Sequence, residues 1–89
     1  MIVIPDSTFF DDFEKIRDKN IIRRAFSAVE KLEVAHSLHE ISNIKSMQGY
    51  PGFYRLRFGD FRIGFRLVDE NTIRLLAIEH RSVFYRRFP

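Results

Sequence analysis

The hydrophobic period of this chain changes at Tyr54, and that change sets the order of its structural elements. Before it, apolar side chains recur at helical spacing in two rows, Phe9-Phe13-Ile16 and Ile22-Phe26-Val29, the second widened by Ile21, Ala25, Ala28 and Leu32. From Tyr54 onwards, apolar residues alternate with arginine or glycine, as they do along half-buried antiparallel strands. The pattern predicts two amphipathic helices followed by a run of strands.

Turn residues divide the second half of the chain into three strands. Gly59-Asp60 and Asp69-Glu70-Asn71 separate a strand that begins at Tyr54, a strand that begins at Phe61, and a strand over Thr72–His80. Between Leu75 and Ile78 this last strand has apolar side chains on both of its faces, so we expect it to be central and covered on both faces. Two shorter segments, Ile2-Val3-Ile4 before Pro5 and Ile44–Met47 before Gly49, are further candidate strands.

We therefore expect one α+β domain over residues 1–89, because a chain of 89 residues has room for a single core. Its two N-terminal helices, the first capped by Ser7 or Thr8, are expected to form an αα-hairpin packed on a twisted, mainly antiparallel sheet of four strands. The lack of cysteine excludes disulfides, zinc–thiolate sites and a cysteine nucleophile, and it fits a reducing cytoplasm. No apolar run approaches the 18 residues of a membrane-spanning helix.

Basic residues are unevenly distributed along the chain. After position 48 there are eight arginines, no lysine and four acidic residues, whereas the whole chain carries a formal net charge of +3. Strand alternation places Arg55, Arg57, Arg62 and Arg66 together on the face opposite the aromatic core. Arginine forms planar, bidentate contacts with phosphate, so this face is suited to a polyanion. The alternative is a solvated face, neutralised across the strands by Glu79 or by the helices.

Two motifs carry a family resemblance. The segment Tyr54-Arg55-Leu56-Arg57-Phe58-Gly59-Asp60-Phe61-Arg62-Ile63-Gly64-Phe65-Arg66 resembles the central hairpin of the RelE/ParE toxin superfamily, and Ile78–Arg86 resembles its closing "H-R-x-x-x-Y" motif. The likeness is specific over residues 47–86 and extends by element order alone over residues 1–46. It implies a RelE-like fold and a cytoplasmic toxin of a type II toxin–antitoxin pair. In the RelE branch, the toxin enters the ribosomal A site and cuts messenger RNA without a metal or cofactor.

The resemblance also assigns roles to individual residues. The candidate catalytic residues are Arg55, Arg57, Arg62, Arg81 and Tyr85, with His80 added as a possible general base. The candidate RNA-binding residues are Arg55, Arg57, Arg66, Arg74 and Arg86. The family often has lysine at the first two catalytic positions, and arginine does not give up its proton. In metal-free RNA cleavage, the 2′-hydroxyl of the substrate attacks the adjacent phosphorus and must lose its proton. The acceptor of this proton is therefore expected to be His80 or Tyr85.

Strand parity and function both leave alternatives open. On strict alternation His80 shares a face with Arg74, and Arg81 falls on the other face with Ile73 and Leu75. Arg81 therefore reaches the arginine face only if the strand ends or bends near His80.

Two other functions fit the same resemblance. A ParE-like toxin, which inhibits DNA gyrase by protein binding, would have the same fold, and a catalytically weak member would act as a co-repressor with its antitoxin. Either toxin interpretation implies a cognate antitoxin protein as partner. Phe84 and Phe88 are expected to anchor the C-terminal tail.

Overall fold

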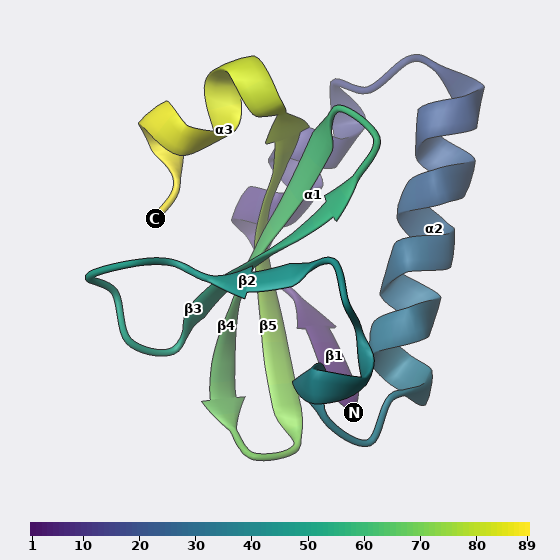
Figure 1. The fold of residues 1–89 in the computed structure, drawn as a ribbon. Helices are drawn as coiled ribbons and strands as arrows, with labels where there is room; N and C mark the ends of the chain where they lie inside the picture. The colour runs from purple at the N-terminus through teal and green to yellow at the C-terminus, as the bar shows by residue number, and fades with distance from the viewer.

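The computed structural model describes residues 1–89 as a mixed sheet with helices on both of its faces (Figure 1). In chain order the elements are β1 (Ile2–Pro5), α1 (Ser7–Glu14), α2 (Lys19–Val34), a single 3-10 turn η1 (Leu38–Glu40), β2 (Ile44–Ser46), β3 (Phe53–Phe58), β4 (Phe61–Asp69), β5 (Thr72–His80) and α3 (Arg81–Arg87). The predicted α+β class is confirmed. The helix α3 was not predicted from the sequence.

The sheet has five strands in the order β1-β5-β4-β3-β2, one more than the four predicted. β1 runs parallel to β5, and the other neighbouring pairs are antiparallel. Both short segments join the sheet as edge strands, which accounts for the extra strand. β5 lies between β1 and β4 and carries buried side chains on both faces, as its sequence pattern predicted.

Aspartates begin both N-terminal helices. Asp6, rather than Ser7 or Thr8, is the N-cap of α1, and its carboxylate accepts hydrogen bonds from the Thr8 hydroxyl at 2.9 Å and the Thr8 amide at 3.4 Å. Asp18 caps α2 in the same way through the amides of the second and third helical residues. The second helix therefore starts directly after Asp18, since the cap satisfies amides that would otherwise have no partner.

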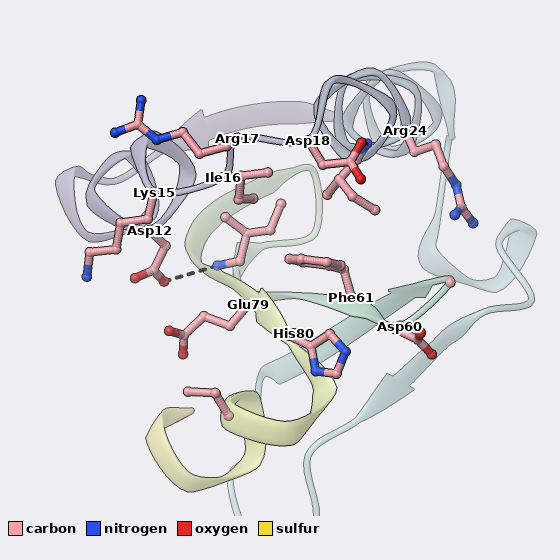
Figure 2. A pocket seen from close by; sticks show the side chains of 14 residues that line it. Asp12, Lys15, Ile16, Arg17, Asp18, Arg24, Asp60, Phe61, Glu79 and His80 are labelled. Carbon is pink, nitrogen blue, oxygen red and sulfur yellow. Dashed lines mark hydrogen bonds between the residues drawn. The ribbon is translucent and has the colours of Figure 1, made fainter.

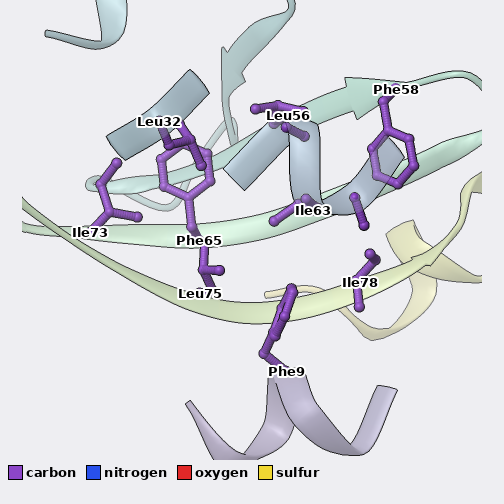
Figure 3. Close-up of a cluster of buried hydrophobic side chains, with 11 residues drawn as sticks. Phe9, Leu32, Leu56, Phe58, Ile63, Phe65, Ile73, Leu75 and Ile78 are labelled. Atoms are coloured by element: carbon purple, nitrogen blue, oxygen red, sulfur yellow. The ribbon is translucent and has the colours of Figure 1, made fainter. Parts of the chain in front are cut away.

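The main core lies between α1, α2 and one face of the sheet (Figure 3). α2 contributes Leu32 and the small side chains of Ala25 and Ala28, which let the helix approach the sheet closely. The expected apolar row through Phe26 is not the buried one, because that ring is 65% exposed and meets only the edge of Phe13, at 5.7 Å between centroids. Every helix of the structure is too short or too polar to cross a membrane.

A second, smaller core lies on the opposite face of the sheet. It consists of Ala77 on β5 and of Phe84 and Phe88 from α3 and the residue that follows it. Phe88 lies flat against Gly64, where an added Cβ would come within 2.7 Å of the phenyl ring. The expectation that Phe84 and Phe88 anchor the tail is confirmed, and the anchored tail carries α3 onto the arginine face.

Candidate active site

The β3–β4 hairpin presents its arginines on the face that α3 partly covers. In the strand register, Arg57 lies opposite Arg62, and Arg55 lies opposite Gly64. Gly59, with φ of +55°, makes the tight turn that joins the two strands. Like charges at directly opposed positions repel by about 0.2–1 kcal/mol, so the hairpin brings its guanidinium groups together against their mutual repulsion.

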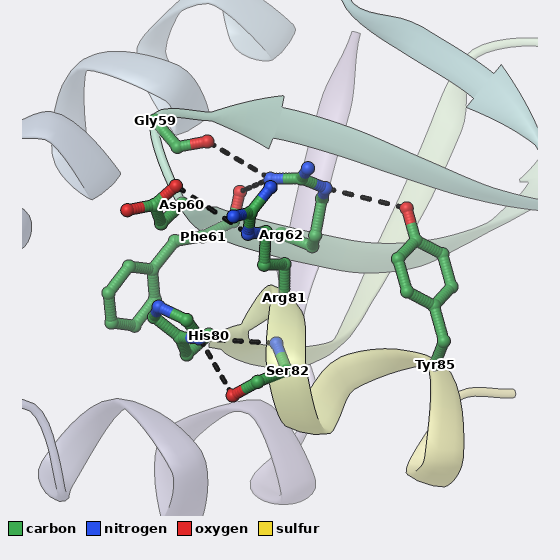
Figure 4. Close-up of polar contacts among 8 residues, drawn as sticks. All are labelled: Gly59, Asp60, Phe61, Arg62, His80, Arg81, Ser82 and Tyr85. Carbon is green, nitrogen blue, oxygen red and sulfur yellow. Dashed lines mark hydrogen bonds and ion pairs between the residues drawn. The ribbon is translucent and has the colours of Figure 1, made fainter.

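Arg62 is the buried member of this group, with only 8% of its surface exposed. One of its terminal nitrogens donates to the Gly59 carbonyl at 3.1 Å and to the Phe61 carbonyl at 3.0 Å (Figure 4). Glu79 lies opposite Arg62 in the register, yet its carboxylate pairs with Arg87 at 2.7 Å. Backbone carbonyls, rather than a carboxylate, therefore hold the Arg62 guanidinium, and its positive charge is not neutralised by an ion pair.

Arg81 reaches the same place because β5 ends at His80 and the chain turns into α3. The Arg81 amide donates to the Asp60 carbonyl at 2.7 Å, and its guanidinium Nε lies 3.7 Å from the Asp60 carboxylate. Figure 4 shows the Arg81 side chain beside that of Arg62, with both directed at the Gly59–Phe61 turn. The change of direction that Arg81 needs to reach the arginine face is thus present where β5 ends and α3 begins.

Tyr85 lies one helical turn after Arg81 and completes the arrangement. Arg62 Nε donates to the Tyr85 hydroxyl at 3.4 Å. Partial burial on its own would raise the pKa of the Tyr85 phenol, but hydrogen bonds and positive charge from Arg62 and Arg55 outweigh it and lower that pKa below its ordinary value. We call this set of residues the arginine–tyrosine cluster; its members are Arg55, Arg57, Arg62, Arg81 and Tyr85.

His80 lies outside the arginine–tyrosine cluster. A bulge in β5 between Leu75 and Ala77 reverses the parity of the strand, so His80 pairs with Phe61 on the face of the main core rather than sharing a face with Arg74. The imidazole Nδ1 lies 2.8 Å from the Ser82 hydroxyl and accepts from the Ser82 amide at 3.1 Å. The expectation from strict alternation was wrong, and His80 serves as the N-cap of α3.

The remaining predicted RNA-binding arginines lie apart from the cluster. Arg66 stacks on the Phe53 ring, 5.6 Å from its centroid, and Arg74 pairs with Asp6 at 3.2 Å. Arg86 is exposed in the last turn of α3. Their assignment as RNA-binding residues stays a prediction.

Two residues that support the cluster, Asp60 and Asp12, were not predicted as site residues from the sequence. Asp60 orients Arg81, as described above, and its place in the predicted turn between two arginine-bearing strands was the available signal. Asp12 on α1 is buried, and its carboxylate accepts the Ile78 amide at 3.1 Å, two residues before β5 ends. No pattern in the sequence linked α1 to that point of β5.

None of the cluster residues lines either of the two large hollows of the structure, which measure about 610 and 630 Å³. One depression, of about 610 Å³, lies between the junction of the two N-terminal helices and the end of β5 (Figure 2). Carboxylates and cations both line it, including Asp12, Asp60, Lys15 and Arg17. Its mixed charge contrasts with the cluster, whose charged side chains are all arginines.

The fold and the cluster together define a small α+β protein with a cationic, tyrosine-bearing site on one sheet face. The family model described as the ParE toxin of the type II toxin–antitoxin system parDE matches residues 3–84. The chain is also 32% identical to the toxin RelE3 of Methanocaldococcus jannaschii over 90 residues, which covers all of both chains. This protein belongs to the RelE/ParE superfamily of toxins of type II toxin–antitoxin systems.

Solved structures agree with this membership. The structure resembles the RelB–RelE antitoxin–toxin complex from Methanococcus jannaschii, with a TM-score of 0.79 and 29% identity, over 97% of this chain and 99% of that one. It also resembles the RelE–RelB complex from Pyrococcus horikoshii, with a TM-score of 0.71 over 91% of this chain and 94% of that one. The second pair is 20% identical, and that likeness shows the shared fold.

Proposed function

We propose that this toxin is a metal-independent endonuclease that cuts messenger RNA on the ribosome, with the ribose 2′-hydroxyl of the substrate as nucleophile. The observation that carries the proposal is the arginine–tyrosine cluster: Arg62 and Arg55 act on the Tyr85 phenol, Arg81 lies beside Arg62, and no carboxylate neutralises the buried Arg62. In-line attack on phosphorus puts developing negative charge on the non-bridging oxygens. Preorganised cations at that position favour the transition state over the ground state.

The geometry suggests a division of roles. Arg62 is held in place by two carbonyls, and Arg81 is fixed through the Asp60 turn, so both suit stabilisation of the phosphorane oxygens. Arg55 and Arg57, on the neighbouring strand, suit contacts with the flanking phosphates. None of these side chains accepts a proton at neutral pH, because arginine stays charged.

Tyr85 is the member of the cluster that can take the proton from the 2′-hydroxyl. Its lowered pKa increases the fraction of phenolate at neutral pH, and the phenol also offers a face on which a base can stack. His80, the other candidate base, uses its Nδ1 in the cap of α3 and faces away from the cluster. We therefore assign proton transfer at the nucleophile to Tyr85.

A cognate antitoxin is the second part of the proposal. The similar archaeal structures are of RelE toxins in complex with RelB antitoxins. By extension, we expect this toxin to be inhibited by a protein partner that covers the cluster or displaces α3. Displacement of α3 would separate Arg62 from Tyr85, whereas a partner that covers the cluster would exclude RNA from it.

A ParE-like action remains the competing function, and the matching family model favours it, since that model describes ParE toxins. A gyrase inhibitor acts by binding protein and has no need of a proton acceptor beside converging arginines. A co-repressor without catalytic power is the remaining alternative, because arginine stands at positions 55 and 57. These functions differ in whether messenger RNA is cut and whether the cluster is required.

Primer extension on cellular messenger RNA after induction tests the proposal. The native protein should produce new 5′ ends in translated messages, and Arg81→Ala should abolish both these ends and growth inhibition. Its melting temperature should hardly change, because the ion pair of Arg81 with Asp60 is exposed, and such pairs contribute about 0–1 kcal/mol.

Arg23→Ala is the matched control. It removes an exposed arginine of α2 whose guanidinium contacts only Asn20, so RNA cutting should persist. A DNA-damage response to the native toxin without new RNA ends would contradict the proposal and support the ParE-like function. A substrate with a 2′-deoxy nucleotide at the cut position should resist cleavage, and continued cutting there would exclude the 2′-hydroxyl mechanism.

A further inference from the structure

A second cationic surface lies at the side of the β3–β4 turn, between α2 and the end of β3. It is a groove of about 340 Å³ lined by nine residues. Three of them are the cations Arg24, Lys31 and Arg57, and none is a carboxylate. Grooves with one sign of charge raise the local concentration of the opposite charge, so this one is suited to an anionic chain.

The α2 side of the groove is a regular polar stripe. Arg24, Ser27 and Lys31 follow one another at intervals of three and four residues, which places them on one helical face beside the buried Ala28. The ion pairs of this structure join Arg74 to Asp6, Arg81 to Asp60 and Arg87 to Glu79. The three cations of the groove are therefore free of carboxylate partners.

Arg24 is held ready for an anion by contacts that leave its charge unpaired. Its guanidinium lies over the Phe58 ring, 5.7 Å from the centroid, and against Gly59, where a Cβ would come within 2.8 Å of it. Stacking on an aromatic face fixes the plane of a guanidinium and leaves its N–H edge available. Figure 2 shows this side chain extending from α2 on the side of Asp60.

The opposite wall of the groove is fixed by backbone contacts. The Arg57 amide donates to the Asn43 carbonyl at 3.0 Å, and the Asn43 side-chain amide donates to the Arg57 carbonyl. These bonds continue the pairing of the sheet edge beyond the end of β2. The wall that carries Arg57 is therefore preorganised, and little conformational entropy is lost there on binding.

The groove is continuous with the arginine–tyrosine cluster. Arg57 lines the groove and lies opposite Arg62 in the strand register. Gly59 lines it too, and its carbonyl holds Arg62. Because α2 and α3 lie on opposite faces of the sheet, an RNA strand bound at the cluster would reach this groove around the Gly59–Asp60 end of the hairpin.

We infer that the groove of Arg24, Lys31 and Arg57 binds the phosphodiester backbone of the RNA strand being cut, next to the scissile nucleotide. This inference rests on the proposed function and names the residues that hold the strand outside the catalytic cluster. The contacts are to phosphate and sugar, so they position the strand without reading its sequence.

Binding of two RNAs of different length separates the groove from the cluster. Fully 2′-O-methylated RNAs lack the nucleophile, so a trinucleotide and a longer homopolymer can be compared at equilibrium by fluorescence anisotropy. The double variant Arg24→Gln/Lys31→Gln should bind the longer RNA about tenfold more weakly, and the slope of log K against log salt should fall by about 1.4 for two lost phosphate contacts. Its affinity for the trinucleotide should equal that of the native protein.

The matched control is Lys19→Gln/Arg23→Gln, which removes the same charge from exposed positions of α2 outside the groove. Lys31→Gln alone should show about half of the effect on log K, so the test does not depend on the packing of Arg24 against Phe58. Circular dichroism melts establish that each variant is folded.

Three outcomes would overturn the inference. The first two are a loss of affinity for the longer RNA no larger than that of the control, and an equal loss of affinity for both RNA lengths. The third is unchanged RNA affinity with weaker co-sedimentation with ribosomes, which would assign the groove to ribosomal RNA. Failure of the proposed function would look different. In that case, Arg81→Ala would bind the trinucleotide as well as the native protein does.

Discussion

At the scale of single residues, the proposed chemistry depends on the contact between Arg62 and Tyr85. A phenol near guanidinium groups loses its proton more readily than one in water, because the phenolate is stabilised by charge and by donated hydrogen bonds. In the proposed mechanism, their hydrogen bond of 3.4 Å links the residue assigned to charge stabilisation to the residue assigned to proton transfer.

Cleavage on programmed ribosomes should therefore depend on pH through Tyr85. The proposal makes the Tyr85 phenolate the active form, and the pKa of this phenol is lowered. The single-turnover rate should therefore rise about tenfold per pH unit below that pKa and level off at a pH lower than the pKa of an ordinary tyrosine. Tyr85→Phe should lower the rate by about 10²–10⁴-fold and remove the slope. An unchanged slope in Tyr85→Phe would assign the titration to another group.

At the scale of elements, α1 takes the place of a longer edge strand. β1 pairs with β5 only as far as Leu75, and beyond that point side chains of α1 satisfy the edge of β5. The Thr8 hydroxyl donates to the Leu76 carbonyl at 2.8 Å, and Asp12 accepts the Ile78 amide. α1 thereby fixes the last residues of β5, from which the chain enters α3.

Asp12→Ala should destabilise the protein by about 1–3 kcal/mol, because it leaves the buried Ile78 amide without an acceptor. Urea unfolding at neutral pH measures this free energy. Asp11→Ala, a change at the exposed neighbouring position, should stay within about 0.5 kcal/mol of the native protein. Equal losses in the two variants would mean that the acidic charge of α1, rather than this hydrogen bond, is what matters.

At the scale of the whole molecule, the site exists because α3 docks on the sheet. The second core of Ala77, Phe84 and Phe88 holds the helix that carries Arg81 and Tyr85. Phe88 fits only because residue 64 lacks a side chain. Packing on one face of the sheet therefore decides whether three separate elements meet at the cluster.

Gly64→Ala should displace Phe88, cost about 1–3 kcal/mol through overpacking and reduce RNA cleavage by shifting α3. Phe88→Ala removes the clashing ring, so the double variant Gly64→Ala/Phe88→Ala should be no less stable than Phe88→Ala alone. Thermal melts and cleavage assays of the four proteins complete the cycle. Additive stability losses would show that Gly64 and Phe88 do not interact.

Much of the fold was predictable because its signals are local. Hydrophobic period placed both N-terminal helices and the three long strands, and Gly59-Asp60 placed the turn between arginine-bearing strands. The errors came from contacts distant in sequence. The bulge in β5 altered the face of His80, and the close approach of α2 through the predicted Ala25 and Ala28 left Phe26, expected on the same apolar face, exposed.

Local sequence is enough to place Arg55, Arg57 and Arg62 on one face of the hairpin, because alternation along a strand follows from backbone geometry alone. The position of Arg81 and Tyr85 beside them is a consequence of tertiary packing. That outcome depends on where β5 ends and on how Phe88 packs against Gly64, 24 positions earlier in the chain. Packing between residues so far apart arises from the whole folded shape, and no local pattern encodes it.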